Sequence, residues 1–182
     1  MTPQQSHAKK DGRLRGRLKV WLPEALFFFV VVACIHLWRT ADMLNANGET
    51  APPLILSVLD GTQDGLELDD PKTRLVYFFA PWCSWCAASA HNIRKLRNWR
   101  DEQELGILLV ALSYQAPEEI RAYVERHELD IPIMLGTPAT AADWGVQVFP
   151  TYYIVDSAGR VVHRDSGYST LAGLWLRSVL AN

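Results

Sequence analysis

Two of the three cysteines, Cys83 and Cys86, are three residues apart in the segment FFAPWCSWC. Thiols at this spacing can bind a metal ion, form a structural disulfide or work as a redox pair. A structural zinc ion needs four ligands, usually two such pairs or one pair with two histidines, and His91, His127 and His163 show no ligand spacing. Two thiolates alone suit Cu(I), so copper binding stays open. A structural disulfide also stays open, although closing a two-residue gap restricts the unfolded chain little.

The residues around the pair favour redox chemistry. A strand expected over residues 74–79 leads to Pro81, which disfavours a helix at the residue before it, so we expect a helix to begin near Trp82 or Cys83. The first thiol then lies at a helix N-terminus, where unpaired amides and the helix dipole stabilise a thiolate. Cys86 is one turn further on the same face, close enough for a Cys83–Cys86 disulfide. We predict that Cys83 is the exposed nucleophile and Cys86 the buried resolving thiol, with no cofactor and no metal.

Strand-like and helix-like segments alternate from residue 54 to the end of the chain. The expected strands cover residues 54–59, 74–79, 107–113, 131–135, 151–155 and 160–164, and the expected helices cover residues 82–100, 117–127, 139–144 and 170–180. The last two strands are joined by DSAG, which is a hairpin turn signal. This order predicts an α/β fold in which helices cover a central mixed sheet, as one domain over residues 54–182.

The N-terminal part of the chain has the composition of a membrane anchor. Residues 1–19 carry six Lys or Arg against one Asp, and residues 20–38 are apolar except at three positions. About 20 apolar residues span a bilayer as a helix, and Trp21 and Trp38 lie where interfacial aromatic residues are favoured. We therefore predict a cytoplasmic basic tail over residues 1–19 and a single transmembrane helix over residues 20–38 of a bacterial inner-membrane protein. Because positive flanks stay in the cytoplasm, the rest of the chain is expected in the periplasm.

Processing of the N-terminal segment is a separate question. The string VVAC loosely resembles a lipoprotein processing site with Cys34 as the acylated residue, but the apolar run continues beyond it. We favour an uncut anchor in which Cys34 is inert. Residues 39–53 are polar, end in a double proline and are predicted to be a short linker.

The charge of the remaining chain argues against a nucleic-acid partner. From residue 39 onward there are 12 Lys or Arg against 18 Asp or Glu. An acidic domain binds polyanions poorly, so no nucleic-acid partner is expected.

Two segments carry a resemblance to a known family. FFAPWCSWC resembles the WCxxC motif of thioredoxin-like proteins, and VFPTYYIVDSAGRVV resembles their cis-proline loop with the hairpin after it. Within that superfamily the chain most resembles the membrane-anchored, TlpA-like thiol–disulfide oxidoreductases, because LILSVLDGTQDGLELDD is similar to their opening hairpin. The segment ELDIPIMLGTPATAADWGVQVFPT further resembles periplasmic proteins described as suppressors of copper sensitivity. The resemblance covers roughly residues 54–180.

The resemblance implies a thioredoxin-like fold and a set of site residues. The Phe149–Pro150 peptide bond would be cis and would lie next to the dithiol, and the residues around it would pair with an extended substrate segment. The substrate-binding residues expected from this resemblance are Trp82, Ser84, Trp85, Phe149, Pro150 and Thr151.

The resemblance also implies partners and an activity. It implies protein thiol or disulfide substrates and a reductase direction. The periplasm is oxidising, so a reductase there needs an electron-donating membrane thiol–disulfide partner. The alternative is a copper-binding or partner-binding module that uses the same fold without turnover.

Two positions depart from the family pattern. Tyr77 stands six residues before the first cysteine, where many thioredoxins have a buried Asp. Ser89 stands three residues after the second cysteine, where several TlpA-like reductases have Glu. Neither of the family's proton acceptors is therefore present, and Tyr77 is expected to be a packed aromatic residue of its strand.

Overall fold

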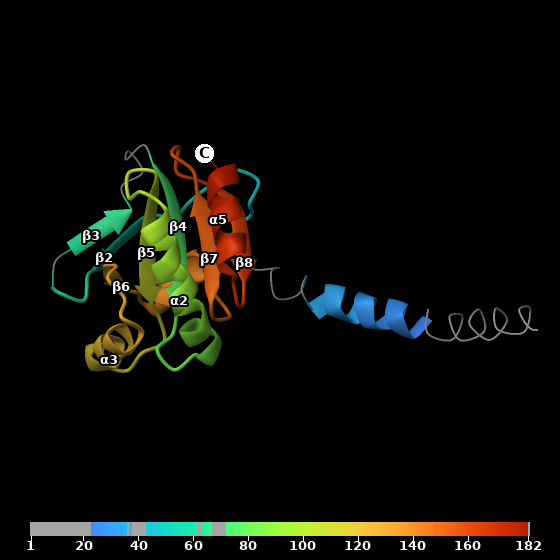
Figure 1. Cartoon of the computed structure of the whole chain (residues 1–182), viewed down its shortest axis with the longest axis horizontal. Coiled ribbons are helices and arrows are strands. Elements are labelled where there is room, and N and C mark those ends of the chain that lie inside the picture. Colours follow the sequence, from blue (N-terminus) through green and yellow to red (C-terminus); the bar gives the residue numbers. More distant parts are fainter. Residues whose placement is uncertain (1–22, 36, 38–42, 62, 67–71, 182) are drawn as a thin grey trace, which may run out of the picture. The chain divides into compact units, whose positions relative to one another are not determined.

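The computed structural model describes residues 23–35, 37, 43–61, 63–66 and 72–181 (Figure 1). The chain divides into two compact units, Met1–Ala41 and Asp42–Asn182. In the first unit, residues 23–35 are helical and most of their large apolar side chains are exposed. Among the described residues, no helix combines the length and the apolar character that crossing a membrane requires. The predicted basic tail and residues 20–22, 36 and 38 of the predicted span lie outside the described residues.

The second unit is built on a six-stranded mixed sheet with the order β1-β8-β7-β4-β5-β6. Its strands are β1 (Glu49–Thr50), β4 (Thr73–Phe79), β5 (Leu105–Ala111), β6 (Ile133–Leu135), β7 (Thr151–Val155) and β8 (Arg160–Ser166). The central strand β4 is parallel to β5 and antiparallel to β7. A separate hairpin pairs β2 (Leu54–Ser57) with β3 (Gln63–Leu66). The predicted central mixed sheet is confirmed.

Side chains of β4 alternate between two apolar cores. Leu75, Tyr77 and Phe79 belong to one buried cluster, and Val76 and Phe78 belong to the other, as the two-residue period of a strand requires. A strand buried on both faces reads as a continuous apolar run, which explains why TRLVYFF has no polar alternation.

In the described part of the second unit, four helices alternate with the strands, and they confirm the predicted flanking helices. They are α2 (Ser84–Trp99), α3 (Pro117–His127), α4 (Pro138–Asp143) and α5 (Leu171–Leu180). Figure 1 shows α2 and α5 packed side by side over the sheet. The helices α2, α3 and α5 bury side chains in the cluster that also contains Cys83 and Cys86.

The linker predicted over residues 39–53 needs a correction. Strand β1 lies within that range and pairs with β8, while Met43 and Ala51 are buried in the second core cluster. Arg164 of β8 holds this segment by donating hydrogen bonds to the carbonyl oxygens of Met43 (2.6 Å) and Leu44 (3.0 Å). Residues 43–53 are therefore part of the folded unit and not a free tether. The reason is that the few apolar side chains of this polar segment, among them Met43 and Ala51, pack in the second core cluster.

Candidate functional site

Cys83 lies at the N-cap of α2, immediately before the first helical residue. Its backbone is extended (φ −82°, ψ 114°), and its Sγ accepts a hydrogen bond of 3.2 Å from the backbone N–H of Cys86. The Cys83 N–H donates to the carbonyl oxygen of Ala80, which closes a turn around Pro81. The helix thus begins at Ser84, slightly later than predicted, and the first thiol caps it. A helix N-terminus with an N–H aimed at the sulfur favours negative charge on that sulfur.

Both thiols are free and both belong to the same core cluster. Cys86 is fully buried, as predicted, whereas Cys83 is only 7% exposed, so the prediction of an exposed nucleophile is wrong in degree. Burial raises the pKa of the Cys86 thiol well above its ordinary value, and the neighbouring Cys83 raises it further. Cys86 is therefore held as a neutral thiol at neutral pH.

Exposed aromatic side chains surround the dithiol. The Trp82 ring packs edge-on against Phe149 at 5.8 Å between ring centroids, and its Nε1–H donates to the Ser113 carbonyl oxygen at 2.8 Å. Trp85 lies 6.4 Å from the ring of Tyr168. Both tryptophans are largely exposed, at 65% and 63%. They form an apolar rim on which a protein segment can lie beside the cysteines.

The Phe149–Pro150 peptide bond is cis, in agreement with the expectation from the resemblance. The Pro150 carbonyl accepts a hydrogen bond of 2.7 Å from Gly167, so it has a partner within the protein. Thr151 begins β7, and its hydroxyl donates to the Val148 carbonyl at 2.8 Å from a fully buried position. The Thr151 side chain therefore faces the interior, and a substrate contact through it is not available. Phe149 is the residue of this loop that the structure brings against Trp82.

Three residues at this site have no signal in the sequence. Ser113 receives the Trp82 indole and has a left-handed backbone (φ 54°), which is rare for a residue other than glycine. The Tyr168 ring lies tilted against that of Trp85, and its hydroxyl accepts a hydrogen bond of 3.0 Å from Asn92 of α2. All of these contacts join residues that are distant along the chain, so no local spacing could have indicated them.

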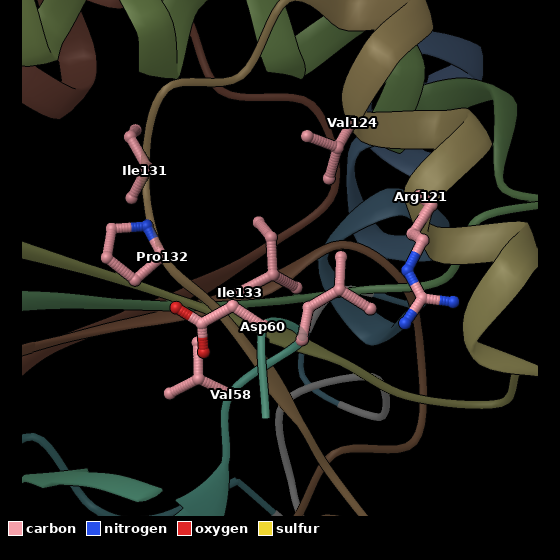
Figure 2. Close-up of a pocket in the computed structure, with 8 residues that line it drawn as sticks. Val58, Asp60, Arg121, Val124, Ile131, Pro132 and Ile133 are labelled. Carbon is pink, nitrogen blue, oxygen red and sulfur yellow. The ribbon is translucent and has the colours of Figure 1, made fainter. Parts of the chain in front are cut away.

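Two pockets lie in the second unit, and one of them shares residues with the site. A pocket of about 440 Å³ adjoins the aromatic rim, since Phe149 and Ser113 both line it. A second pocket, of about 310 Å³, is lined by residues of α3, the chain before β6 and the segment after β2 (Figure 2). Most of its lining side chains are apolar, and the two charged ones are Asp60 and Arg121. Arg121 also forms an ion pair with Glu118. The described residues include no group of three or more His, Cys, Asp or Glu that could hold a metal ion.

Tyr77 is a packed strand aromatic, as predicted, but its hydroxyl is poorly accommodated. The hydroxyl is buried and makes no hydrogen bond of normal geometry with the described residues. The nearby Ser89 hydroxyl acts to lower the pKa of Tyr77, but it donates its own hydrogen bond to the Trp85 carbonyl at 2.9 Å. Burial, followed by the nearby Cys86, raises the pKa of Tyr77 well above its ordinary value, so this phenol does not serve as a base.

Removing this hydroxyl should stabilise the protein. We expect Tyr77→Phe to raise the free energy of unfolding by about 1 kcal/mol, because a buried hydroxyl without a partner costs that order of free energy. Urea denaturation of the reduced protein measures the change. Tyr152 is the matched control, since its ring stacks on Tyr77 at 6.4 Å while its hydroxyl bonds Asp165 and Arg177. Tyr152→Phe should destabilise by about 1 kcal/mol, and equal effects in both variants would contradict the assignment.

Comparison with known proteins agrees with this geometry. The Redoxin family model matches residues 46–173. The thioredoxin-like protein YneN of Bacillus subtilis is 28% identical over 150 residues, which cover 78% of this chain and 86% of YneN. The thiol-disulfide oxidoreductase ResA of Bacillus cereus is 27% identical over 128 residues, which cover 68% of this chain and 71% of ResA.

Solved structures share the fold. The crystal structure of a thiol:disulfide interchange protein of the thioredoxin family from Chlorobium tepidum superposes with a TM-score of 0.65 at 21% identity. The superposition covers 76% of this chain and 99% of that protein. At this identity the likeness shows the fold.

Proposed function

We propose, since the chain belongs to the Redoxin family, that it is a thiol–disulfide oxidoreductase acting on protein cysteines through Cys83 and Cys86. One observation carries the proposal: the Cys83 sulfur caps α2 and accepts the N–H of Cys86, whose own thiol is buried one turn away. This arrangement gives a nucleophilic sulfur and a resolving thiol within reach of it. The names of the relatives support the same chemistry.

The exchange proceeds in two thiol–disulfide steps. The Cys83 thiolate attacks one sulfur of a substrate disulfide, forms a mixed disulfide and releases the other substrate sulfur as a thiolate that takes up a proton. Cys86 then loses its proton and attacks the Cys83 sulfur, which forms the Cys83–Cys86 disulfide and releases the second substrate thiol. Two electrons pass from the protein dithiol to the substrate. The aromatic rim of Trp82, Trp85 and Phe149 holds the substrate segment during both steps.

The direction that we propose is reduction of the substrate. A strong oxidant is one whose reduced form is stabilised. Here Ser84 and Trp85, the residues between the cysteines, bring no positive charge to a thiolate, and Cys86 is held neutral by burial. These features, with the TlpA-like resemblance, support a reductase. A dithiol partner in the membrane would then have to reduce the Cys83–Cys86 disulfide after each turnover.

The location that we propose is the periplasmic face of a bacterial inner membrane. Residues 20–38 would cross the membrane once, with the basic residues 1–19 in the cytoplasm. The exposure of large apolar side chains along the described part of this segment, residues 23–35, supports burial in lipid. The second unit would then act on proteins outside the inner membrane.

Alkylation of the cysteines in intact cells tests the direction and the location together. We expect a membrane-impermeant maleimide to reach Cys83 in spheroplasts without lysis, and we expect most of the Cys83–Cys86 pair to be reduced before labelling. Cys34 serves as an internal control, because it lies in the predicted anchor and should resist the reagent until detergent is added. A mostly oxidised pair would reverse the proposed direction. Labelling only after lysis would overturn the proposed location.

A further inference from the structure

The outward side of α5 is apolar, which is the reverse of a normal surface helix. Its side chains Ala172, Trp175, Leu176, Val179 and Leu180 recur at spacings of three and one, so they form one stripe that we call the α5 outer face. Trp175 is 41% exposed and Leu180 is 76% exposed. A surface helix normally turns polar residues to the solvent, and a contiguous exposed apolar face marks an interaction surface.

The inward side of α5 explains why the polar residues do not cover this stripe. Leu174 and Ser178 are fully buried against the domain. Arg177, the only charged residue of α5, forms an ion pair of 2.9 Å with Asp165 and donates a hydrogen bond to the Tyr152 hydroxyl. The helix thus directs its single charge toward the sheet. The α5 outer face carries no charge at all, although the chain from residue 39 onward has an excess of acidic residues.

We propose that the α5 outer face rests on the lipid surface of the membrane, an inference that depends on the membrane anchor proposed above. Residue 37 belongs to the apolar helix, and Met43 is buried in the domain core, so six residue steps join them. Six extended residues reach about 20 Å. This is less than the diameter of a small domain, roughly 30 Å, so a domain tethered in this way stays beside the bilayer.

The apolar composition of the α5 outer face favours it as the face that meets lipid. Membrane leaflets that carry anionic lipids repel acidic side chains, and α3 exposes Glu118, Glu119 and Glu125 beside Arg121 and Arg126. The α5 outer face avoids this repulsion and presents a tryptophan, which is favoured at the boundary of headgroups and acyl chains. Contact through α5 also keeps the dithiol near the membrane, because Tyr168 just before α5 packs against Trp85 of α2. A membrane partner could then reach Cys83 without the domain leaving the surface.

Tryptophan quenching by brominated lipids tests the contact. The full chain is placed in phosphatidylcholine vesicles with plain or brominated acyl chains, and the emission of Trp175 is obtained by subtracting the Trp175→Phe variant. We expect the Trp175 emission to be roughly twofold weaker or more in the brominated vesicles. Trp82→Phe is the matched control, since Trp82 is 65% exposed but lies outside α5, and its emission should be the same in both vesicles. Quenching of both residues to the same extent would overturn the proposal.

A second variant and a flotation assay keep the outcomes distinct. Leu176→Ser alters the α5 outer face at an exposed position, and we expect it to weaken the quenching of Trp175. Chains that float with the vesicles after alkaline carbonate treatment but show no quenching of Trp175 would overturn the α5 contact and leave the anchor in place. Chains that do not float would overturn both, while disulfide exchange in solution would still support the enzyme. Self-association that Leu176→Ser abolishes, without quenching, would assign the face to a second copy and overturn the lipid contact.

Discussion

Cys86→Ser should trap substrate proteins on Cys83, whereas Cys83→Ser should trap none. Both variants should lose turnover by about 10³-fold or more, because each removes one of the two sulfurs that the exchange requires. Only the first variant keeps the sulfur that caps α2, and it lacks the thiol that would release the substrate. Non-reducing electrophoresis of extracts from cells that express each variant should therefore show covalent complexes for Cys86→Ser. Dithiothreitol should separate these complexes by reducing the mixed disulfide.

The third cysteine provides the control for this experiment. Cys34 lies on the helix over residues 23–35, in the other compact unit, so Cys34→Ser should keep full turnover and should not change the pattern of complexes. Complexes of equal yield with Cys83→Ser would mean that the roles of the two sulfurs are reversed. A complete lack of complexes, together with tight binding of Cu(I) to the reduced pair, would favour a binding module without turnover.

Resolution of the mixed disulfide should accelerate about tenfold for each pH unit between pH 7 and pH 9. Burial, the largest cause, raises the pKa of Cys86 above this whole range, so the thiol is mostly protonated and its reactive thiolate fraction grows in proportion to the hydroxide concentration. The burial of the Cys86 thiol persists in the mixed disulfide, because Cys86 is part of α2 and of the core cluster whatever is bound to Cys83. Single-turnover release of a fluorescent peptide from a preformed mixed disulfide measures this step.

The first step has to be measured separately for this comparison. Cys86→Ser carries out the attack by Cys83 but not the resolution, so its reaction with the same peptide disulfide reports the first step alone. A release rate that is independent of pH would show that a group near Cys86 takes up its proton at neutral pH. Tyr77 would not be that group, because burial raises the pKa of its phenol well above the ordinary value.

Much of the fold and the core of the site could be predicted from the sequence because their signals are local. The spacing of Cys83 and Cys86 after a proline favoured a redox pair, and the apolar run of β4 and the periodic apolar residues of α2 indicated the elements that carry it. The Phe149–Pro150 bond was expected only through the family resemblance, and the structure has it as cis. The cysteine spacing, the apolar run of β4 and the period of α2 depend on neighbours within a few residues, which a sequence displays directly.

Only the tertiary structure decided how much of each residue is accessible and which distant residues meet. It buried Cys83 to 7% exposure, placed the Trp82 indole on Ser113 and turned the Thr151 side chain inward. It also extended the domain to Met43, which the polar character of residues 39–53 concealed. Burial and long-range hydrogen bonds arise from the way strands and helices pack across tens of residues. The spacing of residues along a single segment does not indicate that packing.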